Sequence, residues 1–316
     1  MGSYTEELVD LLTKSVGRYV LGHEVDVRLM TAALLTRGHV LIYGPPGSAK
    51  TLTAKLFAAS LGLRFSRVQF TPDILPSDVV GAKVIDPKTG ELRTVRGPIF
   101  ANVVLADEIN RGNPKTLSAL LEAMQEGQVT IEGDTHPLPQ PFMVVATLNP
   151  VEVHGIFPLP IAVLDRFAVS LRFSYPGEEG EVEMVYRDLE LGLDRASVAP
   201  LAEPGLVGRA MGEVGRVSVK ASVVKYAVAV VRQVRGDPRV SVGPSPRAVT
   251  HLVRVSRVLA LIDGRDYVVP DDVKEASTYV LRHRVVPRTP SRSLLKDLEL
   301  GEEVVSNALT RVRPPW

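Results

Sequence analysis

The stretch HVLIYGPPGSAKTLTAKLFAASL, from His39 to Leu61, decides the fold. Its first five residues are mostly apolar and predict a strand that is buried on both faces. From Thr51 to Leu61 the apolar residues recur at three- and four-residue spacing, which predicts a helix. Between them lies a glycine-containing loop that ends in Lys50 and Thr51. Backbone amides of such a loop, together with the positive end of the helix dipole, bind phosphate groups. The order strand, loop, helix therefore predicts a nucleotide-phosphate site.

Two side chains of the loop have expected roles of their own. Lys50 would reach the β- and γ-phosphate oxygens of ATP, and Thr51 would hold magnesium. Ala49 stands where such loops usually have glycine, and its methyl group fits if the backbone there is helical. The alternative is a plain turn that joins a strand to a helix without a ligand. The candidate ATP-binding residues are Gly44, Pro45, Pro46, Gly47, Ser48, Ala49, Lys50 and Thr51.

A second apolar run, NVVLADE from Asn102 to Glu108, ends in two adjacent carboxylates. We expect this strand to lie beside the strand that carries the phosphate loop. Asp107 would then hold the magnesium shell, and Glu108 would polarise the water that attacks the nucleotide. The alternative is a solvated turn at the end of an ordinary strand.

The rest of the first half alternates short β-rich runs with helical patterns, which is typical of a mostly parallel sheet covered by helices. A further helix is expected at Pro114 to Glu126. Two segments, around Asp86 to Gly90 and around Glu132 to Asp134, have the composition of hairpin turns. The strands are expected at His39 to Tyr43, Arg64 to Phe70, Asn102 to Ala106, Phe142 to Thr147 and Phe167 to Phe173.

The pattern changes at Tyr175-Pro176-Gly177. We therefore expect an α/β domain over residues 1–175 and a small, all-helical domain over residues 176–316. Ser245-Pro246 and Pro270-Asp271-Asp272 carry the capping and first-turn residues that start helices. The helices are expected at Glu178 to Glu190, Lys220 to Arg235, Arg247 to Ile262, Asp271 to Leu281 and Leu294 to Leu309.

The composition limits the class of protein. The 316 residues are 45% hydrophobic and 23% charged, and the net charge of +1 gives no general attraction to nucleic acid, which we consider an improbable partner. The chain has no cysteine, which excludes thiolate metal sites and a cysteine nucleophile. No run reaches the roughly 18 apolar residues of a membrane-spanning helix, so we expect a cytoplasmic protein without membrane insertion.

The motifs together resemble the MoxR group of AAA+ ATPases. The resemblance rests on GHVLIYGPPGSAKT (Gly38 to Thr51), FTPDILPSDVVG (Phe70 to Gly81), GPIFANVVLADEINRGNPKTLSALLEAMQEGQVT (Gly97 to Thr130), ATLNP (Ala146 to Pro150) and FPLPIAVLDRF (Phe157 to Phe167). It implies a P-loop NTPase core with a five-stranded parallel sheet, two hairpin insertions and a separate helical lid. It also implies homo-oligomeric, hexameric rings that bind ATP and Mg²⁺ at each subunit interface.

The resemblance also implies roles for polar residues outside the loop. Asn149 matches the sensor that orients water against the γ-phosphate. Arg166, in the segment LDRF, matches the arginine finger that acts on a neighbouring subunit's nucleotide, where the fork of donors and the permanent charge of arginine are useful. Arg111 is a second candidate for that contact. An Asp165–Arg166 surface pair is the alternative to a finger.

Two further features are matched more weakly. Arg247, in GPSPRA (Gly243 to Ala248), matches the sensor of the lid, and could act on the nucleotide of its own subunit or of a neighbour. The family lines its adenine pocket at positions that match Val20, Leu21, Gly22 and His23, although a plain loop before a helix fits them nearly as well. Ile161 to Val163 are apolar where the family usually has polar residues.

The expected function is ATP-driven remodelling, chaperone-like maturation or metal insertion of a client protein. The resemblance suggests a client that carries a von Willebrand factor A domain. Two alternatives stay open. One is a DNA-directed AAA+ motor, since replicative helicases share the hairpin insertions, and the other is a switch that binds ATP to hold an assembly without hydrolysing it.

Overall fold

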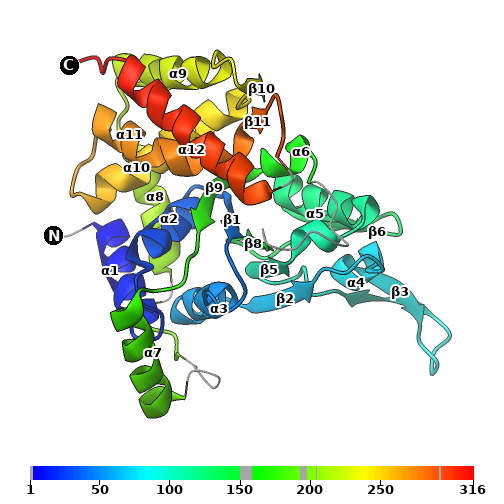
Figure 1. Cartoon of the computed structure of the whole chain (residues 1–316). Helices are drawn as coiled ribbons and strands as arrows, with labels where there is room; N and C mark the ends of the chain where they lie inside the picture. Colours follow the sequence, from blue (N-terminus) through cyan, green and yellow to red (C-terminus); the bar gives the residue numbers. More distant parts are fainter. Residues whose placement is uncertain (1–2, 150–158, 193–197, 204, 292) are drawn as a thin grey trace.

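The computed structural model describes residues 3–149, 159–192, 198–203, 205–291 and 293–316. Five parallel strands form the central sheet in the order β2-β5-β8-β1-β9 (Figure 1). The strands are β1 (His39–Tyr43), β2 (Phe65–Gln69), β5 (Val103–Asp107), β8 (Met143–Leu148) and β9 (Phe167–Arg172). All five expected strands and the expected α/β class with a parallel sheet are confirmed.

One expectation about the sheet is wrong. The strand that ends in Asp107 does not lie beside β1, because β8 is hydrogen-bonded to both and separates them. The strand order depends on contacts between distant segments, which the residues of a single strand do not encode. As a result, the end of β8 lies between the phosphate loop and the carboxylate pair.

Both faces of the sheet are covered, so alternate residues of each strand enter two different cores. One core contains Val40, Leu105 and Val169, and the other contains Leu41 and Ala106. This explains the uninterrupted apolar runs of the central strands. The first core is covered by α1 (Tyr4–Gly17), α2 (Glu24–Leu35), α3 (Lys50–Ser60) and the C-terminal helices, and the second by α4 (Pro76–Val80) and α5 (Pro114–Glu126).

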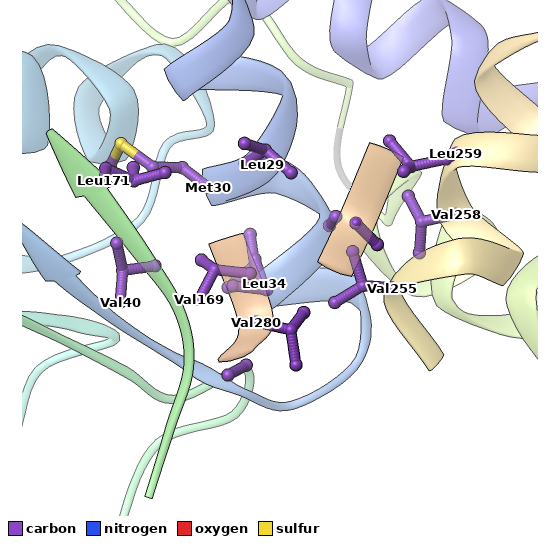
Figure 2. Close-up of a cluster of buried hydrophobic side chains, with 14 of the residues drawn as sticks. Leu29, Met30, Leu34, Val40, Val169, Leu171, Val255, Val258, Leu259 and Val280 are labelled. Carbon is purple, nitrogen blue, oxygen red and sulfur yellow. The ribbon is translucent and has the colours of Figure 1, made fainter. Parts of the chain in front are cut away.

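The C-terminal helices pack directly on the first core. Figure 2 shows Leu29, Met30 and Leu34 of α2 between strand residues on one side and residues of the C-terminal helices on the other. All of the labelled side chains are at most 1% exposed. The core that positions the phosphate-loop strand is therefore continuous with the core of the helical region. The other labelled residues are Val40, Val169, Leu171, Val255, Val258, Leu259 and Val280.

The second half of the chain is mainly helical, as expected, with two differences. A short antiparallel pair, β10 (Val240–Val242) with β11 (Val286–Pro287), lies at the edge of the bundle. The helix α7 (Glu178–Leu191) stands apart from the bundle (Figure 1). The bundle helices are α9 (Ala221–Arg235), α10 (Pro246–Ile262), α11 (Pro270–Leu281) and α12 (Leu294–Arg311), with the 3₁₀ turn η3 (Arg282–Arg284) after α11.

Among the described residues, three of the longer helices were given no bounds from the sequence. They are α1, α2 and α8 (Leu206–Arg216), and α8 packs on both of the others. Glu213 of α8 accepts hydrogen bonds from the backbone N–H groups of Tyr4 and Thr5, at 3.0 Å each, at the start of α1. A carboxylate is favourable at the positive end of a helix, which ties the N-terminus to the second half of the chain.

Two hairpins interrupt the α/β order, at the expected turns. The first joins β3 (Gly81–Ile85) to β4 (Leu92–Arg96) and projects from the sheet, and the second joins β6 (Gln128–Ile131) to β7 (Asp134–Pro137) (Figure 1). An ion pair of 2.8 Å between Lys83 Nζ and Asp134 Oδ2 links them. Ile85 and Leu92 are 68% and 64% exposed, so the tip region of the first hairpin presents apolar surface. Two short elements, the 3₁₀ turn η1 (Ile109–Arg111) and α6 (Ile161–Leu164), complete the described fold.

Across the described ranges, the helices lack the combination of length and apolarity that crossing a bilayer requires. Pro150 of ATLNP, and Phe157 with Pro158 of FPLPIAVLDRF, lie outside the described residues.

Candidate nucleotide-binding site

The loop Gly44–Thr51 joins the carboxyl end of β1 to α3, as the sequence predicts. Gly44 has no room for a side chain, because a Cβ atom there would lie 2.3 Å from the carbonyl oxygen of Phe173. Gly47 has φ of +77°, a conformation that side chains disfavour. Tyr175 donates a hydrogen bond of 2.9 Å to the carbonyl oxygen of Pro46 and holds the loop from outside. The two glycines are therefore required by a close approach and by a left-handed turn.

The expectation for Ala49 is wrong in one respect. Its backbone is left-handed, with φ of 61° and ψ of 15°, and is not helical. The methyl group therefore carries the steric penalty of that conformation, which explains why such loops usually have glycine at this position.

Lys50 folds back over the loop. Its ammonium group donates to the carbonyl oxygens of Gly44, at 2.9 Å, and Pro45, at 2.6 Å. Burial lowers the pKa of Lys50, and the nearby negative charges of Asp107 and Glu108 oppose that shift. The lysine and the two carboxylates therefore converge on one place at the carboxyl ends of the strands.

Asp107 is held rigidly at the end of β5. Thr147 on β8 donates a hydrogen bond to its Oδ1 atom, and Arg67 on β2 donates two to its Oδ2 atom, from Nε at 3.0 Å and Nη2 at 2.6 Å. The hydroxyl of Thr147 also accepts from the backbone N–H of Glu108 at 2.9 Å. The Thr147 contacts are possible because β8 lies next to β5. Both oxygens of this carboxylate are therefore engaged by neighbouring strands.

Glu108 is held through a single oxygen. Its Oε2 atom accepts from Gln69 Nε2, at 2.8 Å, and from Arg111 Nη1, at 3.0 Å. The backbone of Glu108 is left-handed, with φ of 53°, so the chain turns sharply after Asp107 and the two carboxylates separate. Arg111, a candidate for contact with a neighbouring subunit, thus forms an ion pair with Glu108 of its own chain.

Three side chains of this network were missed in the sequence: Arg67, Gln69 and Thr147. Arg67 and Gln69 are alternate residues of β2, so they share a face of the sheet with Asp107. Two polar residues in alternate positions at the end of a strand could have indicated the site, but only with the strand order known. Thr147 gave no signal, because a threonine is ordinary in an apolar strand.

Asn149 follows β8 and is 7% exposed. The preceding Leu148 pairs with Tyr43 of β1, so Asn149 lies level with Gly44 at the start of the phosphate loop. This is the location that a γ-phosphate sensor requires. Its role stays a prediction.

A small pocket adjoins the phosphate loop and includes three of the four residues expected around adenine. Leu21 and Val20 line it together with His23 and Leu52. Gly22 is absent from the lining and has φ of +76°, so it shapes the turn between its neighbours. The segment that follows β9 and the helix α7 also line the pocket, through Ser174, Pro176, Gly180 and Met184.

Arg166 and Arg247 lie at the opposite ends of the strands. Arg166 directly precedes β9, and Phe167 pairs with His39 at the start of β1. The phosphate loop begins five residues further along β1, about 17 Å away at ~3.3 Å per residue. Arg247 contacts the residue before Arg166, since its Nη1 atom is 3.3 Å from Asp165 Oδ2. Both arginines are therefore separated from the phosphate loop of their own chain by the length of the sheet.

The donor set at the carboxyl ends of the strands fits magnesium. Carboxylate and hydroxyl oxygens are its preferred ligands, and Mg²⁺ in nucleotide sites takes one or two protein ligands together with phosphate oxygens. Among the described residues, no group of three or more histidine, aspartate or glutamate side chains could hold a metal ion. An ion at Asp107 and Thr51 would thus need the oxygens of a bound nucleotide.

Comparison with known proteins agrees with this geometry. A sequence model of the ATPase family associated with various cellular activities (AAA) matches residues 39–169, and a model of the AAA lid domain matches residues 232–306. The chain is 42% identical over 291 residues to the uncharacterized protein YeaC of Bacillus subtilis strain 168, covering 90% of this chain and 89% of YeaC. It is 42% identical over 301 residues to the chaperone MoxR1 of Mycobacterium tuberculosis, covering 92% and 78% of the two chains. A crystal structure of a protein from Cytophaga hutchinsonii superposes with a TM-score of 0.87 at 34% identity, covering 98% of this chain and 96% of the other.

Proposed function

The chain belongs to the MoxR-type AAA+ ATPases, and we propose that it hydrolyses ATP, with Mg²⁺, at sites that neighbouring copies complete together. The energy would drive the remodelling or chaperone-like maturation of a client protein. One observation carries the proposal. The phosphate loop and the carboxylate pair lie at one end of the sheet, whereas Arg166 lies at the other.

One copy supplies the binding half of each site. Backbone amides of the loop and the ammonium of Lys50 would bind the phosphates, while Thr51 and Asp107 would hold the metal ion. The ion, when bound, would neutralise charge that develops on the phosphate oxygens. Asn149 would fix the position of the attacking water.

Glu108 would polarise that water. Because Gln69 and Arg111 both bind Oε2, we expect the attacking water to approach Oε1. Arg111 would then act within its own subunit, by holding Glu108 in place. This assigns the contact with the neighbouring nucleotide to Arg166 and not to Arg111.

A neighbouring copy would supply the second half of each nucleotide site. About 17 Å of sheet separate Arg166 from the level of its own phosphate loop, so its guanidinium would reach only the nucleotide of another copy. The same distance argument applies to Arg247, whose side chain is held at Asp165. Both arginines would therefore act in trans, in a ring that we propose to be hexameric.

The client contact is proposed to involve the projecting β3–β4 hairpin. Val84, Ile85, Leu92 and Val95 are between 38% and 68% exposed there. Surface apolar residues that gather at one place are typical of protein contact sites. A von Willebrand factor A domain protein is the client that the family suggests. Pull-down of such a domain by the wild-type chain, compared with an Ile85→Ser and Leu92→Ser double variant, would test this assignment.

The test of the enzyme function compares single variants by phosphate release and by binding of a fluorescent ATP analogue. Lys50→Ala should lose nucleotide binding because the phosphates lose their cation. Glu108→Gln should bind nucleotide without turnover, and Arg166→Ala should bind with unchanged affinity but lose turnover. Wild-type turnover by Glu108→Gln would contradict the role of Glu108 in hydrolysis, whereas a wild-type chain that binds ATP without turnover would favour the non-hydrolytic switch.

Mixing inactive variants then tests the sharing of sites. When Lys50→Ala is mixed one to one with Arg166→Ala, about a quarter of head-to-tail contacts join an intact phosphate loop to an intact arginine, so activity should return to ~25% of wild type. The matched control mixes Lys50→Ala with Glu108→Gln, where every subunit lacks either Lys50 or Glu108 in its own half of the site, so no activity should return. Equal inactivity of both mixtures would rule out Arg166 as a residue acting in trans.

A further inference from the structure

The carboxylate of Asp165 contacts three side chains from the helical region. Ser245 Oγ lies 2.9 Å and 2.8 Å from its two oxygens, and Arg284 Nε donates to Oδ1 at 3.0 Å. Arg247 Nη1 lies 3.3 Å from Oδ2. Ser245 is also the N-cap of α10, because its hydroxyl accepts from the backbone N–H of Arg247 at 3.1 Å. Asp165 is thereby bonded both to the start of α10 and to the turn η3.

Arg284 fixes the backbone around Arg166. It is 2% exposed, and its Nη2 atom donates to the carbonyl oxygens of Asp165, at 3.1 Å, and Phe167, at 2.6 Å. These carbonyls belong to the two neighbours of Arg166 in the chain. Burial lowers the pKa of Arg284 to about 10, so it stays charged at neutral pH opposite Asp165. A buried charge of this kind is retained only with a partner, which makes Asp165 necessary for this arrangement.

Arg166 and Arg247 lie close together under this constraint. Burial and the positive charge of Arg247 both lower the pKa of Arg166, while Asp165 and Glu126 oppose the shift. Three guanidinium groups thus share two carboxylates, of which Glu126 is exposed. The excess positive charge suits a polyanion such as a triphosphate.

We propose that Asp165 is a positioning residue, which locks Arg247 and the backbone of Arg166 into one unit so that both guanidiniums meet the same nucleotide of a neighbouring copy. The inference rests on the proposed function, since it assumes that Arg166 acts in trans. Asp165 itself would not touch the nucleotide. Its contribution is to make the helical region and the finger move together.

The first test replaces Asp165 with asparagine, which keeps the shape of the side chain and removes its charge. Nucleotide affinity should stay within about twofold of wild type, because the variant's own phosphate loop is remote, while turnover should fall about tenfold or more through misplacement of the arginines. Mixing with Lys50→Ala should restore turnover, since that subunit presents intact arginines to the intact loop of Asp165→Asn. A residue needed only for the stability of its own subunit would not be rescued in this way.

A milder variant covers the case in which Asp165→Asn does not fold. Ser245→Ala keeps the Asp165–Arg284 pair and removes the hydroxyl that joins Asp165 to the start of α10. We expect a several-fold loss of turnover with unchanged nucleotide affinity, and recovery on mixing with Lys50→Ala. The matched control is Ser241→Ala, whose hydroxyl instead bonds to the carbonyl oxygens of Val286 and Pro287, and which should keep wild-type turnover.

The outcomes separate this inference from the proposed function. If Lys50→Ala rescues Arg166→Ala but neither Asp165→Asn nor Ser245→Ala, the arginine acts in trans and the positioning role of Asp165 is wrong. Wild-type turnover by the Ser245→Ala and Asp165→Asn variants would also overturn it. If Arg166→Ala itself is not rescued, the failure lies in the proposed function.

Discussion

Replacing Arg67 with methionine should let the site bind Mg-nucleotide at lower magnesium concentration. Arg67 makes two hydrogen bonds to Oδ2 of Asp107, the carboxylate expected in the magnesium shell. A cation and this guanidinium therefore compete for one oxygen. Methionine keeps much of the length and the apolar stem of arginine while removing its charge.

The expected change in magnesium affinity depends on how strongly solvent screens the ion pair between Arg67 and Asp107. Two unit charges at ~4 Å interact by about 4 kcal/mol in a medium of dielectric constant near 20. The Arg67 side chain is 51% exposed and that of Asp107 is 10% exposed, so solvent screens the pair strongly. Exposed pairs contribute up to about 1 kcal/mol, which corresponds to about a fivefold change in a binding constant. The half-saturating magnesium concentration should thus fall by ~5-fold at most.

The assay follows binding of a fluorescent ATP analogue as magnesium is added. Arg93→Met is the matched control, because Arg93 is also half-exposed and ion-paired, 3.8 Å from Asp86, but on the β3–β4 hairpin. It changes the net charge equally without touching Asp107. Identical titrations for the two variants would refute the competition, and a higher magnesium requirement in Arg67→Met would show that Arg67 supports the metal site.

Two further predictions concern stability. Ala49→Gly should raise the free energy of unfolding by about 0.5–1 kcal/mol, because relief of a left-handed alanine, about 1–2 kcal/mol, outweighs the added chain entropy of glycine. The same change at Ala54, in the middle of α3, should cost at least about 1 kcal/mol, and urea midpoints that fall equally would contradict this. His39 accepts from the backbone N–H of Val144 and bonds to the carbonyl of Met124, and burial lowers its pKa to about 4. The neutral form is therefore favoured in the fold, and its contribution of up to ~3 kcal/mol is present above pH 6.5 and lost as the pH falls from 6.5 to 4. Urea midpoints of His39→Gln should vary less over this window than those of wild type, and parallel curves would refute the assignment.

The parts of the fold that the sequence predicted are those set by local chemistry. The strand β1, the loop after it and the helix α5 follow from apolar periodicity and turn residues. The start of α10 follows from Ser245-Pro246, and its capping bond is present. The helices α1 and α8 also carry periodic apolar residues, so their omission was avoidable.

The parts that could not be predicted depend on contacts between distant segments. The place of β8 between β1 and β5 determines that Thr147 meets Asp107, and nothing within β8 specifies its neighbours. Arg284 contacts Asp165 from 119 positions away in the chain. Arginine is rarely buried, so sequence patterns predict such a residue on the surface. The left-handed backbone of Ala49 could not be predicted from the sequence either, because alanine rarely adopts this conformation.

Because Arg166 and the phosphate loop lie at opposite ends of the sheet, the two ends of the molecule would have different roles in an assembly. In the proposed ring, a head-to-tail contact joins unlike surfaces, so each copy would have one face that gives arginines and another that receives them. In an open row of copies, the phosphate loop of the last copy has no neighbour that supplies arginines. Only closure of the row into a ring would complete that last site. A subunit that kept the arginine face but lost the loop face would terminate a growing row, and would act as a substoichiometric inhibitor of assembly. The two unlike ends of such a row follow from the position of Arg166 before β9, at the end of the sheet opposite to the phosphate loop after β1.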